Sequence, residues 1–101
     1  VWPSFWTQRV NRTWPYGGEI DIIETVNLMP SNQYALHTGN SACIASASAT
    51  QSGAIVNANC STPPGSSSAG CTISEPNKNS VGAAFAAVGG GVYATLFDTT
   101  G

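Results

Sequence analysis

The stretch EIDIIE at residues 19–24 decides the fold of this 101-residue chain. Acidic and aliphatic side chains alternate in it with a period of two, which is the pattern of a half-buried β-strand. In a regular strand Glu24 would face away from Glu19 and Asp21. One extra residue at Ile22-Ile23, as in a β-bulge, returns Glu24 to the face of the other two acids. We therefore predict a bulged strand with three carboxylates on one face and isoleucines in the core.

The gathering of acids in this strand points to carbohydrate chemistry. Three of the five acidic residues of the chain lie within these six positions. A retaining glycosidase needs one ionised carboxylate as nucleophile and one protonated carboxyl group as acid, and a third acid between them can tune both. Trp2, Trp6 and Trp14 lie shortly upstream, and their flat faces suit sugar rings. The alternative from spacing alone is an amphipathic edge strand that shows its acids to water and packs the tryptophans in a core.

The rest of the chain has an all-β pattern. Gly, Pro, Ser and Asn interrupt it throughout, and no 11-residue window keeps apolar side chains at helical spacing. The predicted segments are strands at residues 2–6, 19–26 and 33–38, a hairpin of 81–88 and 92–97 joined by Gly89-Gly90-Gly91, and loops at 39–52 and 61–70.

The charge of the chain excludes two classes of partner. Only 8% of the residues are charged, the net charge is −2, and the only cations are Arg9, Arg12 and Lys78. This is too little positive charge to neutralise a run of phosphates, so we expect no nucleic-acid binding. A polybasic membrane anchor is excluded for the same reason, and no apolar stretch approaches the ~20 residues of a membrane span.

The cysteines and sequons favour export. Cys43, Cys60 and Cys71 form an odd set, so one thiol is free or lacks its partner, and the sequence leaves their pairing open. Asn11 and Asn59 begin Asn-X-Ser/Thr triplets, which are glycosylation acceptors in secreted proteins. We expect a secreted, extracellular protein.

Two tryptophan-containing segments, WPSFWTQ at residues 2–8 and WPYGGEIDIIETVN at 14–27, resemble the active-site region of glycoside hydrolase family 16. The likeness is greatest to the fungal laminarinase or endo-1,3(4)-β-glucanase branch, whose signature is E-[ILV]-D-x-x-E. LHTGNSAC at 36–43 and GGGVYATLFD at 89–98 continue the resemblance. It implies a concanavalin-like β-jelly-roll sandwich with a concave cleft. Residues 1–101 would then be the central segment of one catalytic domain, since family domains are more than twice this length.

The resemblance also implies a role for each site residue. Glu19 matches the nucleophile, Asp21 the intervening acid and Glu24 the general acid/base. The implied partner is a β-glucan polysaccharide or oligosaccharide. The positions implied to bind substrate are Trp14 at the cleavage subsite and Trp2, Trp6 and His37 along the cleft. The loop from Trp6 to Trp14 is about one residue longer than the family pattern.

No metal and no cofactor are predicted. A metal site of Glu19, Asp21, Glu24 and His37 is an alternative, but a lone histidine without metal-spaced cysteines suits a hydrogen-bonding role in a cleft better. The calcium site of many family members lies near the domain termini, outside this sequence.

The leading functional hypothesis is retaining endo-hydrolysis of β-1,3-glucan or mixed β-1,3/1,4-glucan. One alternative is a transglycosylase of cell-wall glucan, which shares the covalent intermediate. Another is a non-catalytic glucan-binding module, although both glutamates are intact. A third is a self-assembling fragment, because the open edges of apolar strands pair with other chains.

Overall fold

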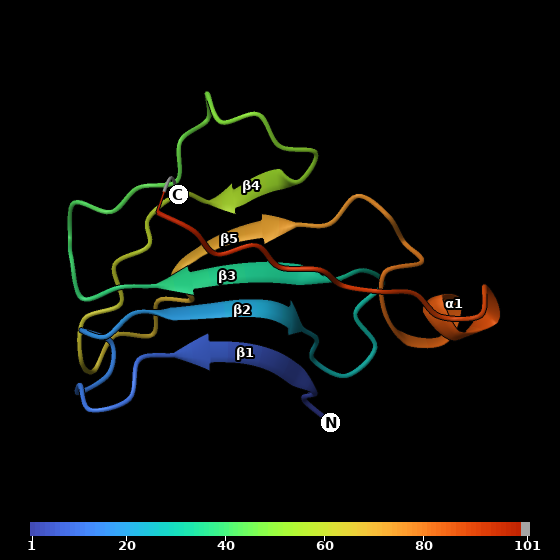
Figure 1. Cartoon of the computed structure of the whole chain (residues 1–101), viewed down its shortest axis with the longest axis horizontal. Coiled ribbons are helices and arrows are strands. Elements are labelled where there is room, and N and C mark those ends of the chain that lie inside the picture. The colour runs from blue at the N-terminus through green and yellow to red at the C-terminus, as the bar shows by residue number, and fades with distance from the viewer. Residues whose placement is uncertain (100–101) are drawn as a thin grey trace.

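The computed structural model describes residues 1–99, which fold around one antiparallel sheet (Figure 1). Its strands lie in the order β1-β2-β3-β5-β4. In chain order the elements are β1 Ser4–Gln8, β2 Glu19–Glu24, β3 Gln33–His37, β4 Ala54–Asn57, β5 Cys71–Ser74 and α1 Gly82–Ala87. The prediction of a β fold with strands near residues 2–6, 19–26 and 33–38 is confirmed.

Strand β2 lies between β1 and β3 and carries the predicted bulge. On β1, the consecutive residues Phe5 and Trp6 pair with Ile23 and Asp21, so Ile22 is the extra residue. The register against β3 shifts at the same place. Because one extra residue reverses the alternation of side chains, the acids before and after the bulge share a face.

The opposite face of the sheet is apolar. Ile20, Ile22 and Leu36 line a hollow on it together with residues 93–96, and Figure 1 shows this last part of the chain running back across the sheet. Large apolar side chains in this last part of the chain remain exposed, namely Val92, Leu96 and Phe97. Burial of apolar surface therefore fixes β2 more firmly than the segment that crosses it.

The predicted hairpin of residues 81–88 and 92–97 is wrong. The first of these segments forms the helix α1, and the second crosses the sheet without forming a strand. The two segments still meet, because the rings of Phe85 and Tyr93 lie 6.3 Å apart. No helix in the part of the chain that the structure describes has the length and apolar character needed to cross a membrane.

Local chemistry explains the helix. Four of the six residues of α1 are alanine, the strongest helix former. Gly89 and Gly90 both have positive φ, and their N–H groups donate to the carbonyls of Ala86 at 3.0 Å and Phe85 at 2.8 Å. This is a Schellman motif, in which glycine ends a helix at little steric cost. The glycine run therefore closes a helix, where the sequence had indicated a hairpin turn.

Strands β4 and β5 pair with each other and were not predicted from sequence. Residues 39–52 and 61–70 around them form loops, as expected. A disulfide joins Cys60 to Cys71, and Cys43 is the free cysteine. The pairing that the sequence left open thus ties the loop before β5 to the start of that strand.

Candidate active site

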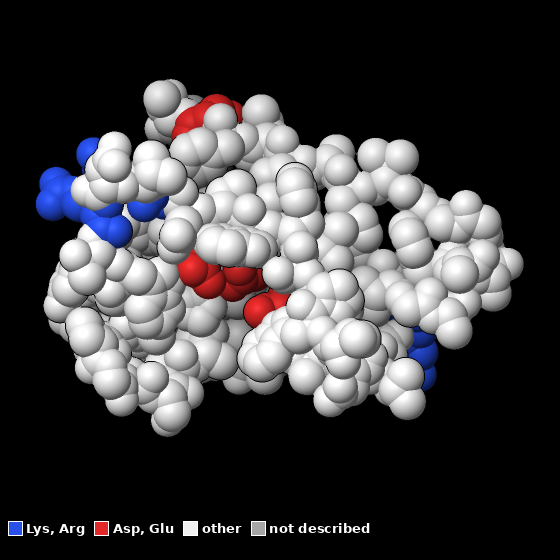
Figure 2. Space-filling model, turned by 90° about the horizontal axis from the view of Figure 1, so that it is seen from below, with Lys and Arg blue, Asp and Glu red and all other residues white. Residues whose placement is uncertain are grey.

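Three carboxylates from β2 form the centre of the site. Figure 2 shows acidic side chains at the bottom of a central hollow, with the basic side chains toward the ends of the same view. Asp21 is only 3% exposed, whereas Glu19 and Glu24 are half-buried. The strand therefore presents two accessible carboxylates on either side of a buried one.

Asn32 holds the bulge of β2 in place. Its side-chain Nδ2 donates to the carbonyl of Ile22 at 2.9 Å, and its Oδ1 accepts from the N–H of Glu24 at 3.0 Å. The residue is 1% exposed, and its own N–H donates to Ser80 Oγ at 2.8 Å. Since a bulge interrupts the ladder between strands, backbone groups there need other partners. One amide supplies both a donor and an acceptor and so fixes the backbone that carries Glu24.

Two tryptophans bind the outer carboxylates. Trp14 Nε1 donates to Glu19 Oε2, and Trp2 Nε1 donates to Glu24 Oε1, each at 2.9 Å. Trp14 is 40% exposed and Trp2 is 66% exposed. Each indole therefore orients one glutamate with its N–H group and leaves ring surface open beside it.

His37 and Trp6 approach Asp21 from the two neighbouring strands. Trp6 is the partner of Asp21 on β1, and His37 on β3 is the partner of Glu19. His37 Nε2 lies 3.2 Å from Asp21 Oδ2, and the His37 ring contacts that of Trp14 with centroids 5.9 Å apart. The approach of Nε2 is off the line of a good hydrogen bond, so the buried Oδ2 lacks a well-aligned donor among the described residues. A small rotation of the imidazole decides whether that bond forms.

The surroundings raise the pKa of Asp21 to about 6, from an ordinary value of 3.8. Burial is the main cause, because it penalises the charged carboxylate, and the nearby charges of Glu24 and Glu19 act in the same direction. His37 opposes them and lowers the pKa. The middle acid therefore changes its charge in mildly acidic solution.

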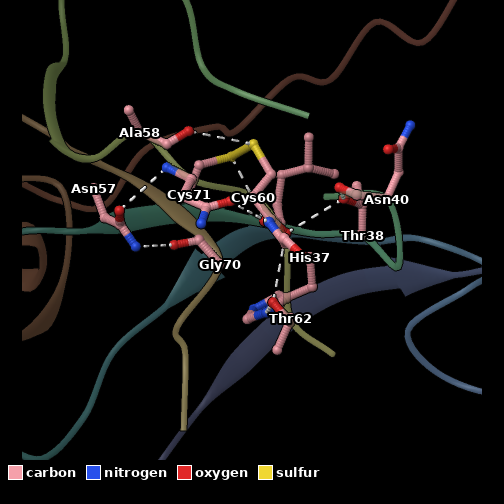
Figure 3. Close-up of a disulfide and its surroundings, with 12 residues drawn as sticks. His37, Thr38, Asn40, Asn57, Ala58, Cys60, Thr62, Gly70 and Cys71 are labelled. Carbon is pink, nitrogen blue, oxygen red and sulfur yellow. Dashed lines mark hydrogen bonds between the residues drawn. A yellow bond between two sulfur atoms is a disulfide. The ribbon is translucent and has the colours of Figure 1, made fainter. Parts of the chain in front are cut away.

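Thr62 supports His37 from the side away from Asp21. Its Oγ1 lies 3.1 Å from His37 Nδ1, and Figure 3 shows the two residues beside the Cys60–Cys71 disulfide. Sequence reasoning missed Thr62 because it lies in a Ser- and Pro-rich loop without a motif. It missed the role of Asn32 because the residue looked like an ordinary turn residue. Only the sheet brings these positions to the site.

One group of described residues could hold a metal ion. Glu19, Asp21 and His37 each offer a ligand atom, and these atoms lie within 4.8 Å of one another. Partners are already present for this group, since Trp14 binds Glu19 and the other two residues face each other. We assign no metal to it, and the expectation of a metal-free site stays a prediction.

The structure gathers every residue that the sequence singled out. The acids, the tryptophans and the histidine come from three neighbouring strands and the segments before β1 and β2. They are Trp2, Trp6, Trp14, Glu19, Asp21, Glu24 and His37. Such a cluster can supply a nucleophile, an acid and aromatic faces within one hollow. Their individual roles stay predictions.

Comparison with known proteins identifies relatives of the chain. The family model of the XgeA-like catalytic domain of glycoside hydrolase family 16 matches residues 1–101. The chain is 43% identical over 94 residues to a probable glycosidase of Schizosaccharomyces pombe, a match covering 92% of this chain and 22% of that protein. It is 39% identical over 94 residues to an endo-1,3(4)-β-glucanase of Emericella nidulans, covering 93% and 14% respectively. The chain thus spans 14–22% of the length of these relatives.

Solved structures give the same result. Laminarinase 16A of Phanerochaete chrysosporium, described with β-glucans in its donor and acceptor sites, superposes with a TM-score of 0.79 at 42% identity, covering 89% of this chain and 29% of that one. An elongating family 16 β-1,3-glucosyltransferase superposes with a TM-score of 0.71 at 40% identity, covering 89% and 28%. The chain therefore belongs to glycoside hydrolase family 16, and its bulged sheet is part of that family's β-jelly-roll catalytic fold.

Proposed function

We propose that this chain carries the catalytic centre of a retaining endo-hydrolase of β-1,3-glucan or mixed β-1,3/1,4-glucan. One observation carries the proposal. Two accessible glutamates lie on one face of a bulged strand, and each accepts a hydrogen bond from an indole whose ring stays exposed. The names of the relatives, which include endo-1,3(4)-β-glucanases and a laminarinase, support the substrate class.

The reaction has two steps. Glu19 attacks the anomeric carbon while Glu24 gives its proton to the leaving glycosidic oxygen, so that a C–O bond to Glu19 forms as the glycosidic bond breaks. Glu24, now ionised, then takes a proton from water. That water attacks the same carbon and releases Glu19 as a carboxylate. Two inversions leave the configuration of the sugar unchanged.

The tryptophans orient both the acids and the sugar. The indole N–H of Trp14 donates to Glu19 Oε2 and so orients the carboxylate that attacks in the first step. The open rings of Trp2, Trp6 and Trp14 offer apolar surfaces on which glucose units can stack. We place the cleavage point between Glu19 and Glu24, beside the two indoles that bind them.

Transglycosylation is a second candidate, favoured by the likeness to the elongating β-1,3-glucosyltransferase. It shares the first step and replaces water with a sugar hydroxyl in the second. Products longer than the substrate, detected by mass spectrometry, would support it over hydrolysis.

The hydrolase proposal should be tested in the full-length protein that the gene encodes. Glu19→Gln should reduce laminarin cleavage at least about a hundredfold, because an amide cannot act as the nucleophile. Glu75→Gln is the matched control, since Glu75 accepts a hydrogen bond from Tyr34 outside the acidic cluster, and its activity should stay within about twofold of the original. Retained activity in Glu19→Gln contradicts the assignment. Laminarin binding without cleavage by the unaltered protein would instead indicate a binding module.

The stereochemistry gives a second test. Retention requires that the first product released be the β-anomer, which proton NMR distinguishes from the α-anomer before mutarotation. The α-anomer as first product would contradict the nucleophilic role of Glu19.

We also propose that residues 1–101 are the central segment of one catalytic domain and that the protein acts outside the cell. The disulfide between Cys60 and Cys71 supports an oxidising compartment. Detection of the intact disulfide by mass spectrometry in protein taken from culture medium would test the location.

A further inference from the structure

Thr62 carries a buried hydroxyl beside the active-site histidine. The residue is 1% exposed, and its Oγ1 lies 3.1 Å from His37 Nδ1 and 3.5 Å from the carbonyl of Cys60 (Figure 3). A hydroxyl has one proton to donate, and the shorter contact is the better hydrogen bond. We take Thr62 as the donor to Nδ1. A neutral imidazole then carries its own proton on Nε2, the nitrogen that faces Asp21.

The position of Thr62 is set independently of His37. Its N–H donates to the carbonyl of Thr38 at 2.9 Å, and the N–H of Thr38 donates to the carbonyl of Cys60 at 2.9 Å. The disulfide joins Cys60 to Cys71, which pairs with Leu36 on β3. The hydroxyl is therefore fixed to the sheet through backbone bonds and a covalent link.

The orientation of the His37 ring determines its hydrogen bond to Asp21. The contact from Nε2 to Asp21 Oδ2 is 3.2 Å long but poorly aligned, so the angle of the ring decides whether the buried oxygen receives a hydrogen bond. Trp14 packs against the ring but has its N–H directed to Glu19. The polar contact at Nδ1 thus comes from Thr62.

We propose that Thr62 is a positioning residue of the active site, whose hydroxyl fixes the rotation and the Nε2–H form of His37 and so supplies a proton donor to Asp21 next to Glu19. The proposal rests on the glucanase function proposed above. Thr62 acts through His37 and does not touch the substrate.

Matched variants separate the hydroxyl from the shape of the side chain. Thr62→Val keeps the shape and removes the hydroxyl, whereas Thr62→Ser keeps the hydroxyl. In the longest gene product, the valine variant should lower kcat on laminarin roughly tenfold with KM within about twofold, because the acids lose orientation while the sugar platforms remain. The serine variant should restore kcat to within about threefold. Equal kcat in the valine variant and the original protein, or equal losses in both variants, would overturn the proposal.

Thr25→Val is the control for losing a buried threonine hydroxyl. Thr25 is buried among Phe5, Ile23 and Val81, away from His37. Its replacement should leave kcat within about twofold of the original value. A tenfold loss in this variant as well would show that the effect of Thr62→Val is not specific to the site.

Nitrogen-15 NMR of the imidazole tests the proposal without any activity. The resonances of His37, assigned by their loss in His37→Gln, should show a proton on Nε2 and a bare Nδ1 in the neutral ring. Thr62→Val should shift them toward a mixture of the two forms. A neutral ring protonated on Nδ1 in the original protein would overturn the proposal. This measurement does not depend on whether Thr62→Val folds. If the original protein gave the expected NMR spectrum but had no glucanase activity, the proposed function would be contradicted. The arrangement of Thr62 and His37 would still stand.

Discussion

Asp21 and Ile22 are neighbours on β2 and almost equally buried, at 3% and 8% exposure, yet they lie on opposite faces of the sheet. The face of Asp21 is built from polar contacts with defined geometry, among them the hydrogen bonds from Trp2 and Trp14 to the two glutamates. The face of Ile22 is an apolar hollow that also contains Ile20 and Leu36. The contacts on the face of Asp21 depend on direction, because hydrogen bonds weaken when they are misaligned. The stabilisation on the face of Ile22 depends mainly on the apolar surface area that is buried, because apolar contacts have no preferred direction.

This difference separates two kinds of mutational effect. Substitutions on the apolar face should act mainly on the free energy of unfolding, whereas those on the acidic face should act mainly on activity and on pH dependence. Asn32 stands between the two, because it bonds the backbone of the bulge at which the strand switches faces. The predictions below run from the largest expected effect to the smallest.

Ile22→Asp should have the largest effect. It places a charge in the apolar hollow without a partner, which should cost more than about 4 kcal/mol of unfolding free energy and leave little folded protein. Ile22→Val, which removes one methylene, should cost only about 1 kcal/mol. Urea unfolding followed by tryptophan fluorescence measures both. A stably folded Ile22→Asp variant would show that this face is not a core.

Asn32→Ala should come next. It removes the partners of the Ile22 carbonyl and the Glu24 N–H, and two unsatisfied buried groups should cost about 3 kcal/mol together. Asn32→Asp keeps an acceptor for the Glu24 N–H, but it buries a charge and sets a carboxylate oxygen against the Ile22 carbonyl, so it should cost at least as much. Urea unfolding and kcat on laminarin are the measurements. A loss of stability below about 0.5 kcal/mol in Asn32→Ala would mean that the bulge holds its shape without this amide.

Removal of the disulfide by Cys60→Ala with Cys71→Ala should lower stability by roughly 3 kcal/mol, as expected for closing a loop of this length in the unfolded chain. The variant should also lose activity beyond its loss of folded protein, since the segment carrying Thr62 is no longer tied to β5. Cys43→Ala is the control, because Cys43 forms no disulfide among the described residues. Equal stability of the double variant and the control would contradict the structural role of the bond.

The acidic face was predictable from sequence because its signal is local. Alternation of charge and isoleucine set the strand, and the position of Glu24 required a bulge that the register confirms. The contacts of Asn32 and Thr62 were not predictable in this way. The bonds of Asn32 to β2 and of Thr62 to His37 join residues 8 to 25 positions apart, so the fold and not the local sequence brings them into contact.

The error at residues 81–97 has a different cause. Valines at both ends and a central glycine run resemble a hairpin, but the alanines between them favour a helix, and glycine serves equally as a hairpin turn or as a helix end. A helix of six residues is too short to show a repeating apolar pattern. Periodicity therefore could not distinguish the two structures here.

Asp21→Asn should have the smallest effect on the fold and a clear effect on its pH dependence. The pKa of Asp21 is 3.8 in its ordinary state and about 6 in the fold, so between these values the folded chain holds a proton that the unfolded chain has lost. The contribution of that proton to the free energy of unfolding is fully present below about pH 4 and is lost as the pH rises through about 6. Asparagine does not titrate, so the variant should lack this loss. Thermal unfolding from pH 3.5 to 7 should therefore show Tm falling with pH in the original protein relative to Asp21→Asn.

The pH profile of kcat should shift or narrow in the variant, because the charge beside Glu19 is gone while both glutamates remain. If both profiles are unchanged, Asp21 is only a polar residue of the strand, and the acidic face needs no third carboxylate.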